Sequence, residues 1–284
     1  MRMNQKEFFK AELICESFRI ILYCCSEKES LRMTSCRKII IEEDLIQFSE
    51  EGYVDSYLIL GEKEAVLVDT LENAEDLYDQ VTETTDLPLR VLLTHAHPDH
   101  AGKGIWKFAE HNVPVYLDSK DDFLLASFGL QNLPYIPLTD GMAFDLGNTV
   151  IESIHCYGHT PGSVVFLDWA KQRLFSGDSV GSGGFWLQLS HSLSMTEFRK
   201  ELVRLLGLAK DMEDLKLYPG HRSQAPVTLD QGYLLDELSL VDDILAGKAE
   251  YPREVMTVGN EPLTYCKASR GYLVDFCYNP DKLV

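Results

Sequence analysis

Seven residues in the first half of the chain, Thr94 to His100, constrain its fold most strongly. They read T-H-A-H-P-D-H and carry three imidazoles and one carboxylate, on His95, His97, Asp99 and His100. The apolar residues before them predict a short buried strand over residues 90–93, which ends where the histidines begin. Imidazole and carboxylate groups together are typical ligands of borderline metal ions such as zinc. We therefore expect a metal-binding loop at the end of a strand.

Three further candidate ligands follow at the ends of predicted strands. His159 lies in the sequence GHTPGS, Asp178 in SGDS and His221 in YPGH, each with a glycine beside it. Glycine permits tight backbone geometry, so a neighbouring side chain can point into a crowded centre. Seven ligands suit two cations that share one carboxylate. The expected arrangement is one metal on His95, His97 and His159, a second on Asp99, His100 and His221, and Asp178 bridging the two.

The whole pattern resembles the metallo-β-lactamase-fold hydrolase superfamily. The histidine motif, His159, Asp178 and His221 occur in the family's order, with spacings of 59, 19 and 43 residues from His100 onward. The sequence AVLVDT over residues 65–70 is similar to the strand that precedes the motif in the family. The resemblance covers residues 37 to 278 and implies an α+β fold. That fold is a four-layer αββα sandwich of two mixed β-sheets, with a dinuclear centre in a cleft at one edge.

The resemblance also implies a cofactor and a reaction. The expected cofactor is two Zn²⁺ per chain, with Fe or Mn as alternatives in one or both sites. Two such cations, about 3.5–4 Å apart, lower the pKa of a bridging water, and the hydroxide then attacks a carbonyl or phosphoryl centre. Asp99 is the expected catalytic residue, because it would both bind metal and orient the nucleophile. Asp69 is expected to orient the histidine loop through hydrogen bonds, although a strand-ending turn aspartate is the alternative interpretation.

The sequence leaves the substrate open among an ester, a thioester, a lactone and a small phosphoester. An aspartate at the bridging position and the lack of a recognisable signal peptide disfavour antibiotic hydrolysis. Glyoxalase II-like thioesterases and lactonase-like relatives share all seven ligands. The tail after His221, however, lacks the basic pattern expected of a glutathione-binding thioesterase.

Two other function classes stay in view. Persulfide-dioxygenase-like relatives have the same fold but bind a single iron, here through residues matching His95, His159 and Asp178. The complete second set of ligands favours two metals over that alternative. A catalytically silent binding module is disfavoured, because no ligand has been lost.

Two loops are expected to line the substrate pocket. The loop over residues 119–137 supplies Phe123 and Tyr135, and the loop over residues 181–193 supplies Phe185, Trp186 and His191. Binding clefts combine apolar walls with a few polar groups, and these residues have that character. Each aromatic residue could equally belong to the hydrophobic core.

Two local patterns predict regular structure beyond the metal loops. Ser194 and Glu197 form a capping box that opens a helix running to Ala209. The residues over 265–278 predict a closing β-hairpin.

Charge and hydropathy limit the partners. The net charge of −19 is the opposite of the basic surface that nucleic-acid binding requires. A membrane-spanning helix needs about 20 consecutive apolar residues, and the sequence contains no such run. We expect a cytoplasmic protein with reduced cysteines and a small-molecule substrate, and neither a nucleic-acid nor a membrane partner. The sequence leaves the oligomeric state open.

The first residues differ in composition from the rest. Residues 1–38 hold eight Lys or Arg against five Asp or Glu, and four of the seven cysteines lie in this stretch. We interpret residues 1–36 as an N-terminal extension of uncertain structure, followed by a metallo-β-lactamase-like domain over residues 37–284. Met33 is an alternative start.

Overall fold

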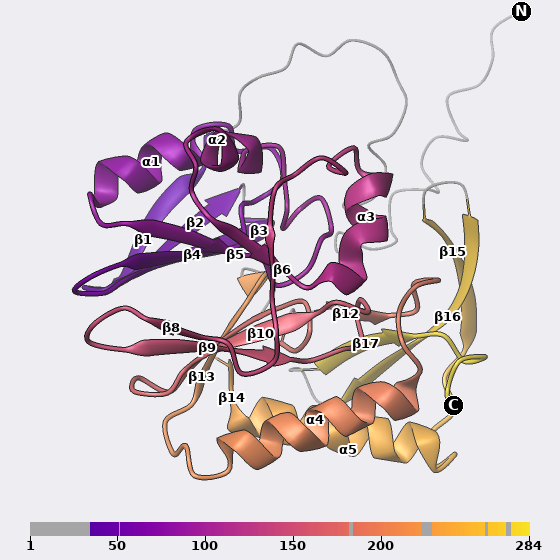
Figure 1. Ribbon diagram of the computed structural model, residues 1–284. Helices are drawn as coiled ribbons and strands as arrows, with labels where there is room; N and C mark the ends of the chain where they lie inside the picture. The colour runs from indigo at the N-terminus through magenta and orange to yellow at the C-terminus, as the bar shows by residue number, and fades with distance from the viewer. Residues whose placement is uncertain (1–34, 51, 182–183, 223–228, 259–260, 271–273) are drawn as a thin grey trace, which may run out of the picture.

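Two β-sheets lie back to back, and helices cover the outer face of each (Figure 1). The computed structural model describes residues 35–284 apart from 51, 182–183, 223–228, 259–260 and 271–273. The four layers confirm the predicted αββα sandwich. The predicted extension and the alternative start at Met33 lie outside the described residues, except for Ser35 and Cys36, so the division of the chain stays a prediction.

The first sheet is mixed, with an antiparallel half and a parallel half. Its seven strands, in spatial order, are β1 (Arg37–Glu42), β2 (Leu45–Glu50), β3 (Val54–Leu60), β4 (Ala65–Val68), β5 (Leu89–Leu92), β6 (Val115–Leu117) and β7 (Ile136–Pro137). Strands β1 to β4 pair antiparallel, whereas β4 to β7 pair parallel. The carboxyl ends of the parallel strands therefore lie at one edge, and β5 ends there just before the histidine motif.

Three helices accompany this sheet: α1 (Leu77–Thr84), α2 (Ile105–Glu110) and α3 (Asp122–Ser127), the last preceded by a 3₁₀ turn over Ser119–Asp121. Helices α1 and α2 cover its outer face, and α3 lies toward one end (Figure 1). All four residues of β4 are buried. Successive side chains of a strand face opposite sides of the sheet, so β4 is covered on both faces. Leu67 packs in the core beneath α1 and α2, whereas Val66 and Val68 pack between the two sheets.

The second sheet is also mixed and is covered by two long helices. Its strands, in spatial order, are β14 (Leu229–Asp230), β13 (Lys216–Pro219), β11 (Arg173–Gly177), β10 (Val164–Asp168), β9 (Val150–His155) and β8 (Ala143–Asp145). Helices α4 (Met195–Ala209) and α5 (Gln231–Leu245) pack on its outer face. The predicted capping box of α4 is confirmed: Glu197 N donates to Ser194 Oγ at 3.3 Å, and Ser194 N donates to Glu197 Oε2 at 3.1 Å.

A third, smaller sheet is the main addition to the prediction. It contains β12 (Gly184–Leu187), β17 (Val274–Tyr278), β16 (Glu261–Arg270) and β15 (Arg253–Val258) in that order. Strands β16 and β17 form the predicted closing hairpin, but β12 joins it in parallel from far upstream. The pairing places the loop after Asp178 beside the end of the chain. None of the helices in the described part of the chain combines the length and hydropathy that a membrane-spanning helix needs.

One buried carboxyl in α5 leads to a testable stability effect. Glu237 is fully buried, and neither of its carboxyl oxygens has a hydrogen-bond partner among the described residues. Burial raises the pKa of this carboxyl well above its ordinary value. In the unfolded chain a glutamate carboxyl has a pKa of about 4.3. Above that pH, folding therefore binds a proton at Glu237, and the free energy of unfolding falls as the pH rises.

We expect the Tm of Glu237→Gln to lie close to that of the native protein at pH 5. At pH 8 the Tm of the variant should be at least about 3 °C higher than that of the native protein, because about 1 kcal/mol shifts the Tm by 2–4 °C. Calorimetry at the two pH values measures the difference. Glu250→Gln, an exposed position after the same helix, serves as the control. The same difference in Tm between native and Glu237→Gln protein at both pH values would contradict a buried neutral carboxyl.

Candidate metal centre

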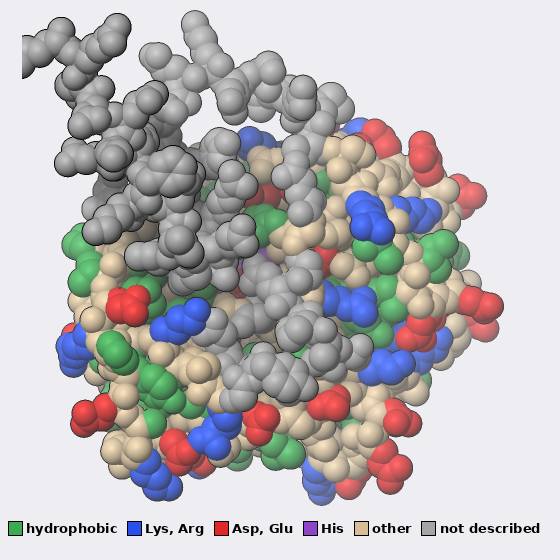
Figure 2. Space-filling view, turned by 180° about the vertical axis from the view of Figure 1, so that it is seen from behind, with side chains coloured by type: hydrophobic (Ala, Val, Ile, Leu, Met, Phe, Trp, Pro, Cys, Tyr) green, Lys and Arg blue, Asp and Glu red, His purple; other side chains and the backbone are tan. Residues whose placement is uncertain are grey.

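The seven candidate ligands converge at the edge where the two sheets meet. The loop after β5 carries His95, His97, Asp99 and His100, and the loops after β9, β11 and β13 carry His159, Asp178 and His221. Three overlapping groups have ligand atoms within 4.8 Å of one another: His95, His97 and His159; His95, His100 and Asp178; Asp99, His100 and His221. A small area of histidine surface is visible near the middle of the face in Figure 2.

The first set of ligands is formed by three imidazoles. His97 Nδ1 lies 3.0 Å from His95 Nε2 and 2.9 Å from His159 Nε2. Burial lowers the pKa of all three imidazoles, so they are neutral at physiological pH and have free lone pairs. Without a metal, these nitrogens can hydrogen-bond one another only if a ring turns its proton inward, whereas one cation can accept all three lone pairs.

The second set combines two imidazoles with a carboxylate. His221 Nε2 lies 3.4 Å from Asp99 Oδ2. His100 Nε2 is fully buried and, among the described residues, makes no properly oriented hydrogen bond. It faces Asp178 Oδ1 at 3.3 Å and Asp99 Oδ2 at 3.8 Å. An orphaned buried nitrogen aimed at two carboxylates fits a metal ligand better than it fits a packed core residue.

Asp178 reaches both sets. Its Oδ2 lies 3.3 Å from His221 Nε2 and 3.7 Å from His159 Nε2. Burial raises the pKa of this carboxyl, but the imidazoles of His221 and His100 outweigh burial and hold the pKa well below its ordinary value. The carboxylate is therefore charged, and its oxygens face imidazoles of both sets.

Each imidazole turns its second ring nitrogen outward to a fixed partner. The partners are Thr94 Oγ1 for His95 (3.1 Å), His191 Nε2 for His97 (3.1 Å), Asp69 Oδ2 for His100 (2.8 Å), the Trp186 carbonyl for His159 (2.8 Å) and the Tyr53 carbonyl for His221 (2.6 Å). A carbonyl can only accept, so the Nδ1–H groups of His159 and His221 donate and their Nε2 atoms face the centre. Outward hydrogen bonds of this kind are typical of metal-binding histidines.

Asp69 lies where its predicted role requires it. Its Oδ1 accepts a hydrogen bond from Thr94 N at 2.8 Å, and its Oδ2 accepts one from Thr94 Oγ1 at 2.8 Å and contacts His100 Nδ1. The backbone of Asp69 has a φ of 61°, in the left-handed region. The hydrogen bonds hold this conformation in place, and they tie the end of β4 to the histidine loop.

Asp121 has a comparable position that sequence reasoning missed. This buried carboxylate accepts hydrogen bonds from Ala96 N (3.1 Å), Gly162 N (2.8 Å) and Thr160 Oγ1 (2.8 Å). It therefore joins the loop of His95 and His97 to the loop of His159. The only sequence signal was a cluster of three aspartates over residues 118–122, which does not indicate which of them faces inward.

Tyr53 is a second residue that sequence reasoning missed. Its hydroxyl donates to Asp99 Oδ2 at 3.2 Å, while its carbonyl accepts from His221. One residue between β2 and β3 thus contacts two candidate ligands of the second set. Neither contact has a sequence signal, because Tyr53 is an isolated aromatic residue in a turn.

The predicted pocket residues lie in different environments. Phe123 is exposed, and its ring centroid lies 5.7 Å from that of His191. The Tyr135 hydroxyl donates to Asp122, on the same segment as Phe123. Trp186 contributes its backbone carbonyl to His159, as described above, and its side chain is half-buried.

Phe185 does not lie on an open wall. It is fully buried and stacks on Phe198 and Phe276, with centroid distances of 4.6 and 5.0 Å. Alternate residues of β12 face opposite sides, so Phe185 and Leu187 turn into the core beneath α4. The expectation that Phe185 lines the pocket is corrected accordingly.

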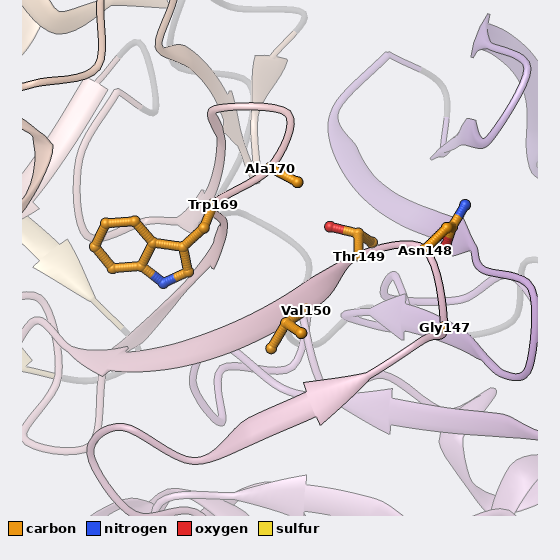
Figure 3. A pocket seen from close by; sticks show the side chains of 6 residues that line it. All are labelled: Gly147, Asn148, Thr149, Val150, Trp169 and Ala170. Carbon is orange, nitrogen blue, oxygen red and sulfur yellow. The ribbon is translucent and has the colours of Figure 1, made fainter.

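A separate hollow lies away from the candidate ligands (Figure 3). It has a volume of about 410 Å³ and is lined by Gly147, Asn148, Thr149, Val150, Trp169 and Ala170, from the β8–β9 and β10–β11 turns. None of these residues has an ionisable side chain. The hollow therefore offers no chemistry of its own.

Comparison with known proteins assigns the family. The model of the metallo-beta-lactamase superfamily matches residues 49–221, which include all seven candidate ligands. The chain belongs to the metallo-β-lactamase superfamily. This finding confirms the family indicated by the spacing of the motifs.

The relatives include thioester hydrolases. The chain is 34% identical over 137 residues to the hydroxyacylglutathione hydrolase GloC of Haemophilus influenzae, a match covering 43% of this chain and 64% of that protein. It is 26% identical over 216 residues to the acyl-coenzyme A thioesterase MBLAC2 of Homo sapiens, covering 62% and 75% respectively. The solved structure of a metallo-beta-lactamase from Pontibacter korlensis matches with a TM-score of 0.61 and 20% identity, covering 74% of this chain and 100% of that one. This last likeness shows the fold alone.

Proposed function

We propose that this member of the superfamily is a dinuclear zinc hydrolase that cleaves acyl thioesters. His95, His97 and His159 would hold one ion, and Asp99, His100 and His221 the other. The observation that carries the proposal is the position of Asp178, whose carboxylate lies within 3.3 Å of ligand atoms of the second set and 3.7 Å of one in the first. The similarity to the two thioester hydrolases supports the choice of substrate class.

Two zinc ions would supply hydroxide near neutral pH and would polarise the carbonyl oxygen of the substrate. Asp99 would orient the attacking water, because its own orientation is fixed by the Tyr53 hydroxyl at 3.2 Å. Asp69 and Asp121 would hold the ligand loops through the hydrogen bonds described above.

A thiol has an ordinary pKa of about 8.5, so a thiolate can leave without a strong proton donor. Thioesters therefore suit this site better than alkyl esters, whose leaving alkoxides are much more basic.

The mononuclear iron alternative would use His95, His159 and Asp178 alone. Against it stands the second set of ligands, which is complete, buried and held by its own outward hydrogen bonds. A single-iron centre would leave these groups without a function, whereas two zinc ions use all seven.

Metal analysis and a thioester assay test the proposal together. We expect the full chain, purified without added metal, to carry about two zinc ions and to release free thiol from a simple acyl thioester. Elemental analysis measures the metals, and absorbance of a thiol reagent follows the reaction. One iron per chain with no thiol release would overturn the proposal and would favour oxygen chemistry.

A further inference from the structure

Two phenylalanines expose nearly half of their surface beside the candidate metal centre. Phe123 is 44% exposed and Phe128 is 45% exposed. The Phe128 ring centroid lies 6.4 Å from that of His97, and the Phe123 ring lies over His191. The residues between them behave differently, since Leu124 and Leu125 of the same helix are buried in the core. Helix α3 thus presents its aromatic side chains to the centre and its aliphatic ones to the interior.

These two positions are unusual within this protein. The structure describes ten phenylalanines, and the other eight are all buried. Leaving a phenylalanine in water forgoes a large part of its burial free energy, and contiguous exposed apolar surface commonly marks a binding site. Phe128 lies next to the candidate ligand His97, and Phe123 lies next to its hydrogen-bond partner His191. This placement indicates a surface that a ligand covers.

The aromatic surface is continuous with the metal centre and fixed to it. His191 Nε2 lies 3.1 Å from His97 Nε2, so His191 connects the Phe123 ring to the ligand set. Asp121, immediately before α3, accepts the hydrogen bond from Ala96 N between His95 and His97. The helix and the ligand loop therefore hold a constant relative position. We call Phe123, Phe128 and His191 the aromatic rim.

Charge distinguishes the two sides of the centre. The three side chains of the aromatic rim carry no carboxylate, ammonium or guanidinium group, and the Lys282 ammonium beside His191 donates to the carbonyls of Ser190 (3.1 Å) and Ser192. On the side of Asp99, the carboxyl of Glu72 is half-buried, and the Glu72 backbone N–H donates to the carboxylate of Glu50 at 3.0 Å. An anionic group would lose hydration against the rim and would be repelled on the Asp99 side. The three rim side chains themselves therefore suit an uncharged, apolar part of a substrate.

We infer that the aromatic rim binds the hydrocarbon chain of the acyl group, so the preferred substrates are thioesters of medium-chain apolar acids. This inference rests on the proposed function for its chemistry and adds the identity of the acyl group. In the reaction the oxygen of water bonds to the acyl carbon and the carbon–sulfur bond breaks. The products are the carboxylic acid and the thiol, and no oxidant or reductant is consumed.

The first test compares acetyl and octanoyl thioesters of N-acetylcysteamine, which share one leaving group. We expect kcat/KM to be at least about tenfold higher for the octanoyl substrate, since added methylenes in an apolar site strengthen binding. Phe123→Ala and Phe128→Ala should each remove about five- to tenfold of that advantage, mainly through KM. Trp169 is an exposed aromatic residue in the separate hollow. Trp169→Ala should leave kcat/KM unchanged for both substrates.

The second test measures binding without turnover, so that failure of the two proposals can be told apart. Calorimetry on the zinc-loaded full chain compares the ethyl and octyl thioethers of N-acetylcysteamine, which cannot be hydrolysed. We expect the octyl thioether to bind at least about tenfold more tightly, and both phenylalanine variants to lose most of that difference. Tighter octyl binding without any thioester turnover would overturn the proposed function and keep the apolar site. Equal binding of the two thioethers, or phenylalanine variants that behave as the native protein, would overturn the aromatic rim as an acyl site, even if thioesters were hydrolysed.

Discussion

Asp178→Asn is expected to lower the kcat/KM for thioester hydrolysis by about 10³-fold or more, equivalent to roughly 4 kcal/mol of transition-state stabilisation. The substitution keeps the size of the side chain but removes its negative charge. Asp178 is the carboxylate that lies between His159 and His221. An amide there cannot neutralise two cations, so we expect the variant to retain less than two zinc ions per chain. Steady-state kinetics and elemental analysis on the same preparation give both quantities.

The control for this variant is Asp145→Asn, which removes the same charge from an exposed position at the end of β8. It should keep full activity and two zinc ions. Circular dichroism should show that both variants are folded. An Asp178→Asn protein that hydrolysed thioesters at the native rate with two bound ions would remove Asp178 from the bridging position.

The candidate ligands could be read from the sequence because each of them follows directly after a strand. His95, His159, Asp178 and His221 lie within a few residues of the ends of β5, β9, β11 and β13. The two sheets place these strand ends at a common edge, so the spacing of ligands along the chain corresponds to a single site in space. The layered fold was implied by the family resemblance, and the seven candidate ligands were indicated by their places after predicted strands.

The residues that support the ligands could not be read in the same way. Asp121 contacts Ala96, Thr160 and Gly162, which are 25 to 41 residues away in the chain. Its role depends on where the turn before α3 packs against two other loops. The sequence shows three aspartates at this place, but local patterns do not predict which carboxylate points inward.

The position of Phe185 illustrates the same limit on the second loop. Its segment reads as a glycine-rich loop with two aromatic residues, yet it pairs as β12 with β17, about 90 residues later in the chain. The pairing decides which of the two aromatic side chains enters the core. Only the tertiary structure supplies that information, because both residues have the same local preference.

Removing the metal ions should have the second largest effect. We expect a chelator to abolish thioester hydrolysis and to lower the Tm by about 10 °C or more, because each ion bound at about 1,000 times its Kd stabilises the folded state by roughly 4 kcal/mol. The physical cause lies in the ligand set after chelation, where the nitrogens of His95 and His159 both lie about 3 Å from His97 Nδ1 and lose the cation that would accept their lone pairs. Differential scanning calorimetry before chelation, after chelation and after addition of two equivalents of zinc measures the effect.

Zinc should restore both the Tm and the activity, whereas magnesium, which prefers oxygen ligands, should restore neither. A chelated protein that melts at the native temperature would show that the seven residues do not hold metal in the purified protein.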